Sequence, residues 1–344
     1  MSKQHLFGLN LAELQSVAAN AGLPKFAAKQ MADWLYKKNI SDIAEMSNIS
    51  VRGREALAND YDIGRVEPTL TLTSTDGTRK MLFDYDGKSI ETAFIPDGHE
   101  ERNTLCVSSQ VGCKMACKFC MTGRQGFSGN LTAGEILNQM ASTEGYEELT
   151  NMVFMGMGEP MDNIDEVLKA LEILTSPWGY AWSPRRITVS SIGIPAQLRR
   201  LLDESEVHVA ISLHSPNAEK RAELMPAQKG FPIAETLSLL AQYDWSGQRR
   251  LTFEYTLFQG VNDTQADVNA LVKLLTPFRW CRVNLIAFNA IPDSDLKGCN
   301  RKRMEWFRDA LNDKGLTATI RLSKGQDIDA ACGLLSTKRN SGQQ

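Results

Sequence analysis

Three cysteines stand close together in the chain, at a spacing that suits metal chemistry. They are Cys113, Cys117 and Cys120, in a C-x3-C-x2-C run with Phe119 directly before the last cysteine. Because the chain has only seven cysteines in 344 residues, three at a prescribed spacing arise by chance roughly 0.003 times per chain. Soft thiolates at this spacing could ligate an iron–sulfur cluster or zinc. A closed zinc site requires four ligands and the run offers only three, which would leave one iron of a four-iron cluster open to a substrate.

Polar residues and glycines follow several stretches that have the composition of β-strands. They are Gly158, Glu159, Ser190, the tripeptide Ser212-Leu213-His214, and Asn289. The glycine would let the backbone approach a ligand closely, and Glu159 could accept a hydrogen bond from an ammonium group. Each signal alone is weak, because a glycine-rich turn is usually only a turn and a single histidine is usually structural. Together they favour a ligand site where the carboxyl ends of parallel strands meet.

From Thr104 onward, β-branched runs alternate with amphipathic stretches, which is typical of repeated βα units. Six units in succession predict an α/β fold whose parallel strands form a barrel or an open partial barrel. The predicted strands are 104–108, 151–155, 186–190, 207–212, 250–257 and 282–288. The predicted helices are one that opens with the capping box from Thr132 to Glu135, then 164–174, 195–202, 233–243, 264–275 and 301–314.

The first hundred residues have a different pattern. Helical periodicity at 9–19 and 25–37 predicts a small helical accessory domain over residues 1–65, either a bundle that only caps the main domain or one that recruits RNA. Short β-like runs predict a β connector over residues 66–100, and residues 101–336 would form the barrel with a carboxyl-terminal catalytic segment. Residues 337–344 resemble a flexible tail. The β-like runs are 69–74, 79–85 and 88–95.

Composition narrows the class of protein. The net charge of −3 argues against a uniformly basic polyanion binder, so any nucleic-acid surface must be local. No stretch approaches ~18 uninterrupted apolar residues, and the amino terminus lacks a signal-peptide core, so we expect a cytoplasmic protein with no membrane partner. In a reducing cytosol, clustered cysteines indicate metal binding or catalysis before disulfides.

The cysteine run matches the signature of the radical S-adenosylmethionine (SAM) superfamily, C-x3-C-x-aromatic-C, with Phe119 as the aromatic residue. The resemblance implies a [4Fe-4S] cluster held by Cys113, Cys117 and Cys120. It also implies that the open iron binds the amino and carboxylate groups of SAM, which is cleaved to a radical. The expected fold is a partial (βα)6 barrel, in agreement with the six units of the pattern.

An ordered set of motifs makes the resemblance narrower. The segments 105–113, 156–160, 212–217 and 325–333, together with the cysteine run, closely resemble the RlmN/Cfr group of radical SAM RNA methyltransferases. The resemblance extends from about Leu9 to Ser336. Radical chemistry in this group methylates a carbon of adenine that ordinary methyl transfer cannot reach.

This resemblance assigns roles to three residues outside the cluster. One SAM methylates Cys332, and a second SAM, cleaved at the cluster, activates that methyl group for addition to adenine, so that two SAM molecules are used per turnover. Glu91 corresponds to the proton acceptor, although it could be an ordinary surface carboxylate. Cys106 corresponds to the thiol that attacks Cys332 and frees the product as a transient disulfide. The SAM contacts map to Gly158, Glu159, Ser190, Ser212, Leu213, His214 and Asn289.

The same resemblance suggests the substrates and partners. They are an adenosine in the peptidyl-transferase centre of 23S rRNA, the tRNA adenosine 3′ to the anticodon, and a reducing electron donor such as flavodoxin, for a monomeric enzyme. The terminal 327–335 segment favours methylation at C2, and a Cfr-type enzyme that methylates C8 is the alternative. A non-enzymatic iron–sulfur RNA-binding or redox protein is a second alternative. For Cys281 and Cys299, burial as small apolar residues is the simplest interpretation.

Local charge offers candidates for RNA contact. Lys114, Lys118 and Arg124 have no acidic neighbour within residues 104–134, and residues 297–344 carry ten basic and five acidic side chains. For the run from Arg301 to Arg303, a solvated helix face is the simpler interpretation. The target adenine would have to be unstacked to reach a buried site.

Overall fold

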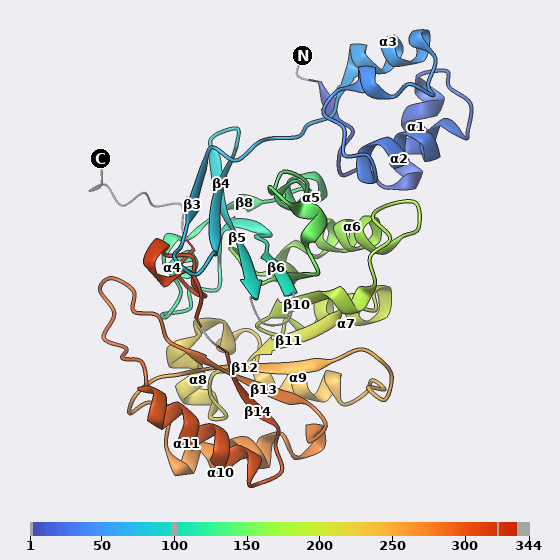
Figure 1. The fold of residues 1–344 in the computed structure, drawn as a ribbon. Helices are drawn as coiled ribbons and strands as arrows, with labels where there is room; N and C mark the ends of the chain where they lie inside the picture. Colours follow the sequence, from blue (N-terminus) through green and yellow to red (C-terminus); the bar gives the residue numbers. More distant parts are fainter. Residues whose placement is uncertain (1–2, 98–101, 322, 336–344) are drawn as a thin grey trace.

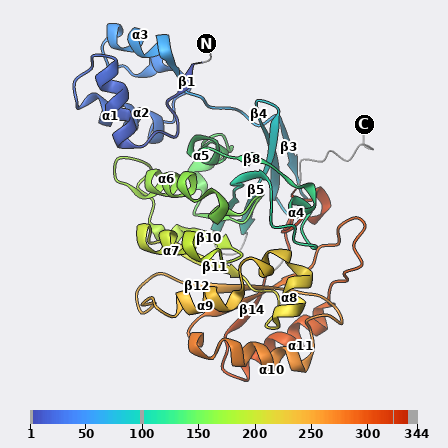
Figure 2. The same cartoon turned by 180° about the vertical axis from the view of Figure 1, so that it is seen from behind.

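The computed structural model describes residues 3–97, 102–321 and 323–335. Figures 1 and 2 show a small helical domain at the amino terminus, drawn in blue, that stands beside a larger α/β domain. The predicted tail at 337–344 lies outside the described residues. Within the described part of the chain, no helix is long and apolar enough to cross a membrane.

The small domain is built from α1 (Leu11–Asn20), α2 (Ala27–Tyr36) and α3 (Val51–Asp60), and its ends meet where β1 (Gln4–His5) pairs with β2 (Tyr61–Asp62). Helix α1 begins at Asn10, whose side chain accepts from the backbone of Glu13 while the Glu13 carboxylate accepts in return. Both α1 and α2 occupy stretches with predicted helical periodicity. Helix α3 was not predicted, because it buries only Gly53 and Leu57 and has little apolar periodicity.

The large domain contains one sheet of ten strands, in the order β14-β13-β12-β11-β10-β9-β6-β5-β4-β3. Seven neighbouring strands, from β14 to β6, run parallel. The α/β fold with a run of parallel strands is therefore confirmed, and six of these strands lie at the predicted places. The seventh, β14, was not predicted, although residues 316–321 alternate apolar and polar side chains. The parallel strands are β6 (Arg102–Cys106), β9 (Asn151–Phe154), β10 (Ile187–Ser191), β11 (His208–Ser212), β12 (Leu251–Leu257), β13 (Arg282–Ala287) and β14 (Ala318–Arg321).

The β connector joins the same sheet. Strands β3 (Leu70–Thr73), β4 (Arg79–Tyr85) and β5 (Lys88–Asp97) are antiparallel, and β5 pairs with β6 so that Ala93 lies opposite Cys106. Since β5 runs opposite to β6, its residue Glu91 lies beyond the carboxyl end of β6. The connector thereby brings a carboxylate to the edge of the sheet where the parallel strands end.

Helices return the chain between the parallel strands and lie along the outer side of the sheet (Figures 1 and 2). The capping box of Thr132 and Glu135 starts α5 as predicted. The longer helices are α5 (Ala133–Ala141), α6 (Ile164–Thr175), α7 (Pro195–Glu204), α9 (Ile233–Leu240), α10 (Gln265–Leu274) and α11 (Arg301–Asn312). The shorter elements are α4 (Met121–Gln125), α8 (Ala218–Leu224), the hairpin strands β7 (Gln110–Gly112) and β8 (Phe127–Asn130), and 3-10 turns at Ile43–Glu45, Tyr146–Glu148, Pro160–Asn163, Pro184–Arg186, Pro226–Lys229, Thr276–Phe278 and Gln326–Ile328.

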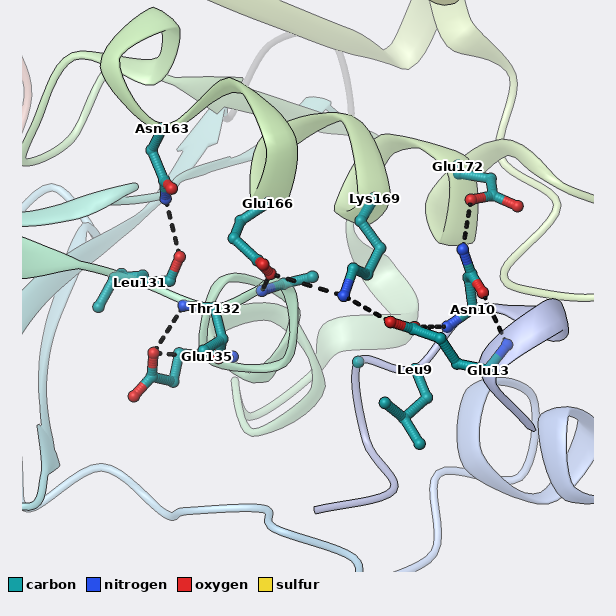
Figure 3. A network of polar contacts seen from close by, with 12 residues as sticks. Leu9, Asn10, Glu13, Leu131, Thr132, Glu135, Asn163, Glu166, Lys169 and Glu172 are labelled. Atoms are coloured by element: carbon teal, nitrogen blue, oxygen red, sulfur yellow. Dashed lines mark hydrogen bonds and ion pairs between the residues drawn. The ribbon is translucent and has the colours of Figure 1, made fainter. Parts of the chain in front are cut away.

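The small domain is held against α5 and α6 by polar and aromatic contacts. Figure 3 shows Lys169 of α6, whose Nζ lies 2.9 Å from Oε1 of Glu13, and Asn10, whose Nδ2 donates to Glu172 over 3.2 Å. The ring of Tyr36 packs against Trp178 and Tyr180. The two domains share one apolar core as a result.

Candidate functional site

A cavity of about 260 Å³ opens at the carboxyl ends of the parallel strands. Its walls come from the cysteine loop, from the turns after β9 to β13, and from the terminal segment around Cys332. Twelve residues predicted for the site line it, namely Cys106, Cys113, Cys117, Phe119, Cys120, Gly158, Glu159, Ser190, Ser212, His214, Asn289 and Cys332. This is the arrangement expected when parallel strands end at one edge of a sheet.

The β7–β8 hairpin brackets the cysteine loop. At its base the Cys113 amide donates to the carbonyl oxygen of Gly126 over 2.9 Å. Gly112 has a φ of +75°, and a Cβ at this position would lie 1.7 Å from the same carbonyl oxygen, so only glycine fits. Further along, the Lys118 amide donates to the carbonyl of Leu224 in α8. The hairpin and α8 together fix the loop that presents the three thiols.

The three thiols lie in a buried environment that suits a polynuclear cluster. Burial raises the pKa of Cys113 to about 12, and burial followed by the charges of Cys120 and Cys113 raises the pKa of Cys117 well above its usual value. Among the described residues, no group of three His, Cys, Asp or Glu side chains is close enough to hold a single metal ion. Three thiolates from one loop beside an open cavity can hold a cluster with one iron free, whereas a closed zinc site requires a fourth ligand.

Glu159 is a buried residue of the cavity wall whose charge raises the pKa of Cys113 and Cys117. Its Oε2 accepts from the Ile192 amide over 2.9 Å and its Oε1 from the Met161 amide over 3.1 Å. Burial raises the pKa of Glu159 to about 7, against the lowering effect of these hydrogen bonds. The preceding Gly158, at φ +101°, packs so closely on Gln110 that a Cβ would lie 2.6 Å from its side chain. In this structure the glycine allows two backbone segments to pack together beside the cavity.

His214 follows β11 in a left-handed conformation, with φ of +53°. Its Nδ1 accepts from the Thr256 amide over 2.9 Å, so the proton of the neutral ring is on Nε2. Burial, and then the charge of Arg221, lowers the pKa of His214 to about 3, which keeps the ring neutral. The ring packs 4.8 Å from that of Phe119, centroid to centroid, and thereby supports the cysteine loop.

Cys106 and Cys332 reach the cavity from distant parts of the chain. Cys106 ends β6 and is 9% exposed, whereas Cys332 exposes its surface to the cavity. Burial raises the pKa of Cys106 to about 12 and that of Cys332 to about 11. Asn289 donates to the Cys332 carbonyl over 3.0 Å and so fastens the terminal segment to the turn after β13. All seven cysteines lie within the described residues, and all are free thiols.

Two charged residues of the cavity were missed by sequence reasoning. Glu254 of β12 is 3% exposed and lies 3.6 Å from Nη1 of Arg321, the last residue of β14. Arg321 also donates to Sδ of Met155 over 3.4 Å, although four strands separate β14 from β9 in the sheet order. The sheet must therefore curl so that its ends face each other. A carboxylate in the interior of an apolar strand was the available signal, since such residues are rarely buried without a partner.

Two residues assigned to the site by resemblance do not line the cavity. Leu213 is fully buried, and its amide donates to the Glu254 carbonyl. Glu91 is 8% exposed, and its Oε1 lies 3.2 Å from Nζ of Lys80. Ala93 lies two residues further along β5, on the same side as Glu91, opposite Cys106. Glu91 is thus near the site without facing the cavity itself.

The two remaining cysteines and several of the basic side chains proposed for RNA contact pack or pair with other parts of the protein. Cys281 is 2% exposed in the core, and Cys299 lies 3.5 Å from the Asp263 carboxylate. Arg301 pairs with Glu305 one turn along α11, as expected for a solvated helix face. Three other basic side chains of the cavity mouth and terminal region form ion pairs, Lys114 with Asp162, Arg303 with Asp263, and Arg308 with Asp309. Arg124 donates hydrogen bonds to two backbone carbonyls.

Comparison with known proteins agrees with this geometry. The radical SAM superfamily matches residues 107–274, and the ribosomal RNA large subunit methyltransferase N-terminal domain matches residues 4–63. A probable dual-specificity RNA methyltransferase RlmN of Bacteroides fragilis is 55% identical, with 98% of each chain covered. The dual-specificity RNA methyltransferase RlmN of Marinobacter nauticus is 41% identical, with 97% of this chain and 92% of the relative covered.

A solved structure resembles almost the whole chain. The radical SAM methyltransferase from Sphaerobacter thermophilus superposes with a TM-score of 0.89 at 38% identity, covering 96% of this chain and 99% of that one. The fold, the cysteine loop and the full-length relatives lead to one assignment. This chain belongs to the RlmN family of dual-specificity RNA methyltransferases, within the radical SAM superfamily, whose members use a [4Fe-4S] cluster and SAM.

Proposed function

We propose that this enzyme forms 2-methyladenosine in 23S rRNA and in tRNA, with Cys332 as the methyl carrier and Cys106 as the thiol that releases the product. The observation that carries the proposal is the shared cavity of two cysteines from opposite ends of the large domain, beside the cysteine loop. The negative charge of a Cys332 thiolate raises the pKa of Cys106, as expected for two thiols that face the same cavity.

The cluster and SAM, when bound, supply the radical chemistry of the superfamily, and two SAM molecules are consumed per turnover. The protein's own steps are carried by its thiols. The Cys332 thiolate takes a methyl group from SAM by displacement and later holds the base as a thioether. The Cys106 thiolate then attacks the Cys332 sulfur and forms an S–S bond, while the electrons of the broken C–S bond remain on carbon, which takes up a proton. An external thiol must reduce the disulfide before the next cycle.

Glu91 is proposed to accept the ring proton. Its position beyond the carboxyl end of β6, on the side of β5 that carries Ala93, supports this role. The ammonium group of Lys80 forms an ion pair with the Glu91 carboxylate over 3.2 Å and so holds the side chain in place. Because Glu91 does not line the cavity, RNA binding would have to bring the base toward it.

The names of the relatives support the choice of substrates. "Dual-specificity" and "ribosomal RNA large subunit" describe those proteins, and we infer the same two RNA classes here, at the peptidyl-transferase centre and beside the anticodon. Methylation at C8 is the alternative, and C2 is favoured because the full-length relatives carry the RlmN name. We further infer that the enzyme is monomeric and cytoplasmic and that an electron donor such as flavodoxin reduces it. Residues 1–65 of the enzyme would recruit the RNA.

The mechanism is tested by removing the releasing thiol. Cys106→Ala should leave RNA joined to Cys332, because no thiol remains to break the C–S bond, and the adduct should be retained on a denaturing gel. The double variant Cys106→Ala, Cys332→Ala is the matched control and should show no adduct. Cys332→Ala alone should lose methyl transfer but keep its iron. If Cys106→Ala turns over normally with no adduct, the releasing role is wrong.

A further inference from the structure

Arg221 is buried beneath the wall of the cavity that carries the cysteine loop. It lies on α8 and is 1% exposed. Its Nε donates to the Leu213 carbonyl over 3.1 Å, and its Nη2 donates over 2.9 Å to the carbonyls of both Ile192 and Ser212. Its Nη1 donates to the side-chain amide oxygen of Gln228. The guanidinium thus joins the ends of β10 and β11 to α8.

All four of these acceptors are neutral. The buried or half-buried ion pairs of the described residues join other side chains, such as Lys80 with Glu91, Lys220 with Asp267, and Arg321 with Glu254. Within the described chain, Arg221 has no carboxylate within ion-pair distance. A cation removed from water without an opposite charge is costly, even when its N–H groups are hydrogen-bonded. The fold therefore keeps a positive charge in its interior that requires a counter-charge.

The cysteine loop is in the position to supply that charge. The loop is fastened to the same helix, since the Lys118 amide donates over 2.9 Å to the carbonyl of Leu224, the last residue of α8. Burial lowers the pKa of Arg221 to about 10, and the negative charge of a Cys117 thiolate raises it. The Phe119 ring of the loop packs 4.8 Å from that of His214, the residue directly after Ser212 and Leu213, whose carbonyls Arg221 binds. The guanidinium therefore lies behind the part of the wall against which the cysteine loop packs.

We propose that Arg221 is a positioning residue for the iron–sulfur cluster, whose buried charge offsets part of the negative charge of the bound cluster and its thiolates. Reduction adds one further negative charge at the same place, so a nearby cation favours it. Arg221 should therefore help to retain the cluster and should raise its reduction potential. The inference rests on the cluster of the superfamily and does not depend on the roles of Cys106 and Cys332.

The test uses variants of the full chain that change charge with little change of shape. Gln228→Glu keeps an oxygen acceptor for Arg221 but places a carboxylate against the guanidinium, which cancels its charge. Arg221→Met removes the charge, and Arg221→Lys retains it with fewer hydrogen bonds. Arg65→Gln is the control, because Arg65 is also largely buried and donates to the carbonyls of Asn39 and Ala141, away from the cavity.

Each variant is checked for folding by circular dichroism and reconstituted anaerobically, and its iron content and cluster midpoint potential are measured. Gln228→Glu and Arg221→Met should hold less iron and show potentials more negative than the wild type, whereas Arg221→Lys should recover most of the potential and Arg65→Gln should change neither. If Arg221→Met fails to fold, Gln228→Glu decides alone. An unchanged potential and iron content in Gln228→Glu, or a potential in Arg221→Lys displaced as far as in Arg221→Met, would overturn the proposal. Neither readout involves RNA or methyl transfer, so failure of the proposed function would leave this result unaffected.

Discussion

At the scale of single residues, the proposed chemistry depends on the charges that surround Cys106 and Cys332. Arg321 lies in the cavity, held by the buried Glu254, and its charge lowers the pKa of both Cys106 and Cys332 against the larger raising effect of burial. Only the thiolate is a nucleophile, so a cation at this place increases the reactive fraction at neutral pH.

Arg321→Met should therefore shift the reactivity of Cys332 to higher pH. In protein without a cluster, the rate of Cys332 alkylation by iodoacetamide should rise with pH toward its pKa of about 11. The variant should be about three- to tenfold slower at pH 8, since one pKa unit changes the thiolate fraction tenfold. Peptide mass spectrometry measures the rate. Lys324→Met, at another cavity-lining cation, is the control, and a variant profile that coincides with the wild-type profile would disprove the role of Arg321.

At the scale of elements, the β7–β8 hairpin determines whether the cysteine loop can form. Gly112 and Gly126 both have positive φ, but only at Gly112 would a Cβ collide with backbone, 1.7 Å from a carbonyl oxygen, whereas nothing lies within 4 Å of a Cβ at Gly126. The two glycines therefore separate the effect of a close approach from that of backbone conformation alone.

Gly112→Ala should lose most of its cluster, while Gly126→Ala should keep much of it and lose about 1 kcal/mol of stability through its backbone strain. The comparison requires iron content per folded protein after identical reconstitution. Equal iron content in the two variants would show that the close approach at Gly112 does not control the loop.

At the scale of the whole molecule, the small domain and the large domain share one core across α2, α5 and α6. Tyr36, which is 1% exposed, links them because its ring packs against Trp178 and Tyr180. Its hydroxyl donates to the Leu9 carbonyl and accepts from the Gly8 amide, which fixes the ring within the small domain. The ion pair of Lys169 with Glu13 at the same interface is partly exposed (Figure 3). A buried hydrogen bond usually contributes more to the free energy of unfolding than a partly exposed ion pair does, so the two contacts should stabilise the protein unequally.

Tyr36→Phe should reduce the free energy of unfolding by about 1–3 kcal/mol, because the Gly8 amide loses a buried acceptor. Lys169→Ala should cost only about 0–1 kcal/mol. Urea denaturation followed by circular dichroism measures both. A Lys169→Ala variant as unstable as Tyr36→Phe would contradict the expectation that the buried hydroxyl contributes more to stability than the partly exposed ion pair.

The sequence predicts those features whose pattern lies within one short segment, and it does not predict those that depend on contacts between distant segments. The longer strands and helices were predicted because their periodicity is local, and the cysteine run because its spacing is local. Helix α3 buries too few residues for a periodic pattern. Strand β14 does carry an alternating pattern, at residues 316–321, and could have been predicted. Arg221, Arg321 and Glu254 acquire their roles only when distant strands meet around one cavity, which no local pattern encodes.

We propose that the enzyme methylates adenosine at C2. The most direct test of this proposal is mass spectrometry of nucleosides from 23S rRNA and tRNA, taken from a strain lacking the enzyme and treated with the reconstituted protein, SAM and a reductant. The wild-type protein should form 2-methyladenosine in both RNA classes, and Cys332→Ala should form none. The appearance of 8-methyladenosine, or of no methylated adenosine from a protein that retains its cluster, would contradict the proposal.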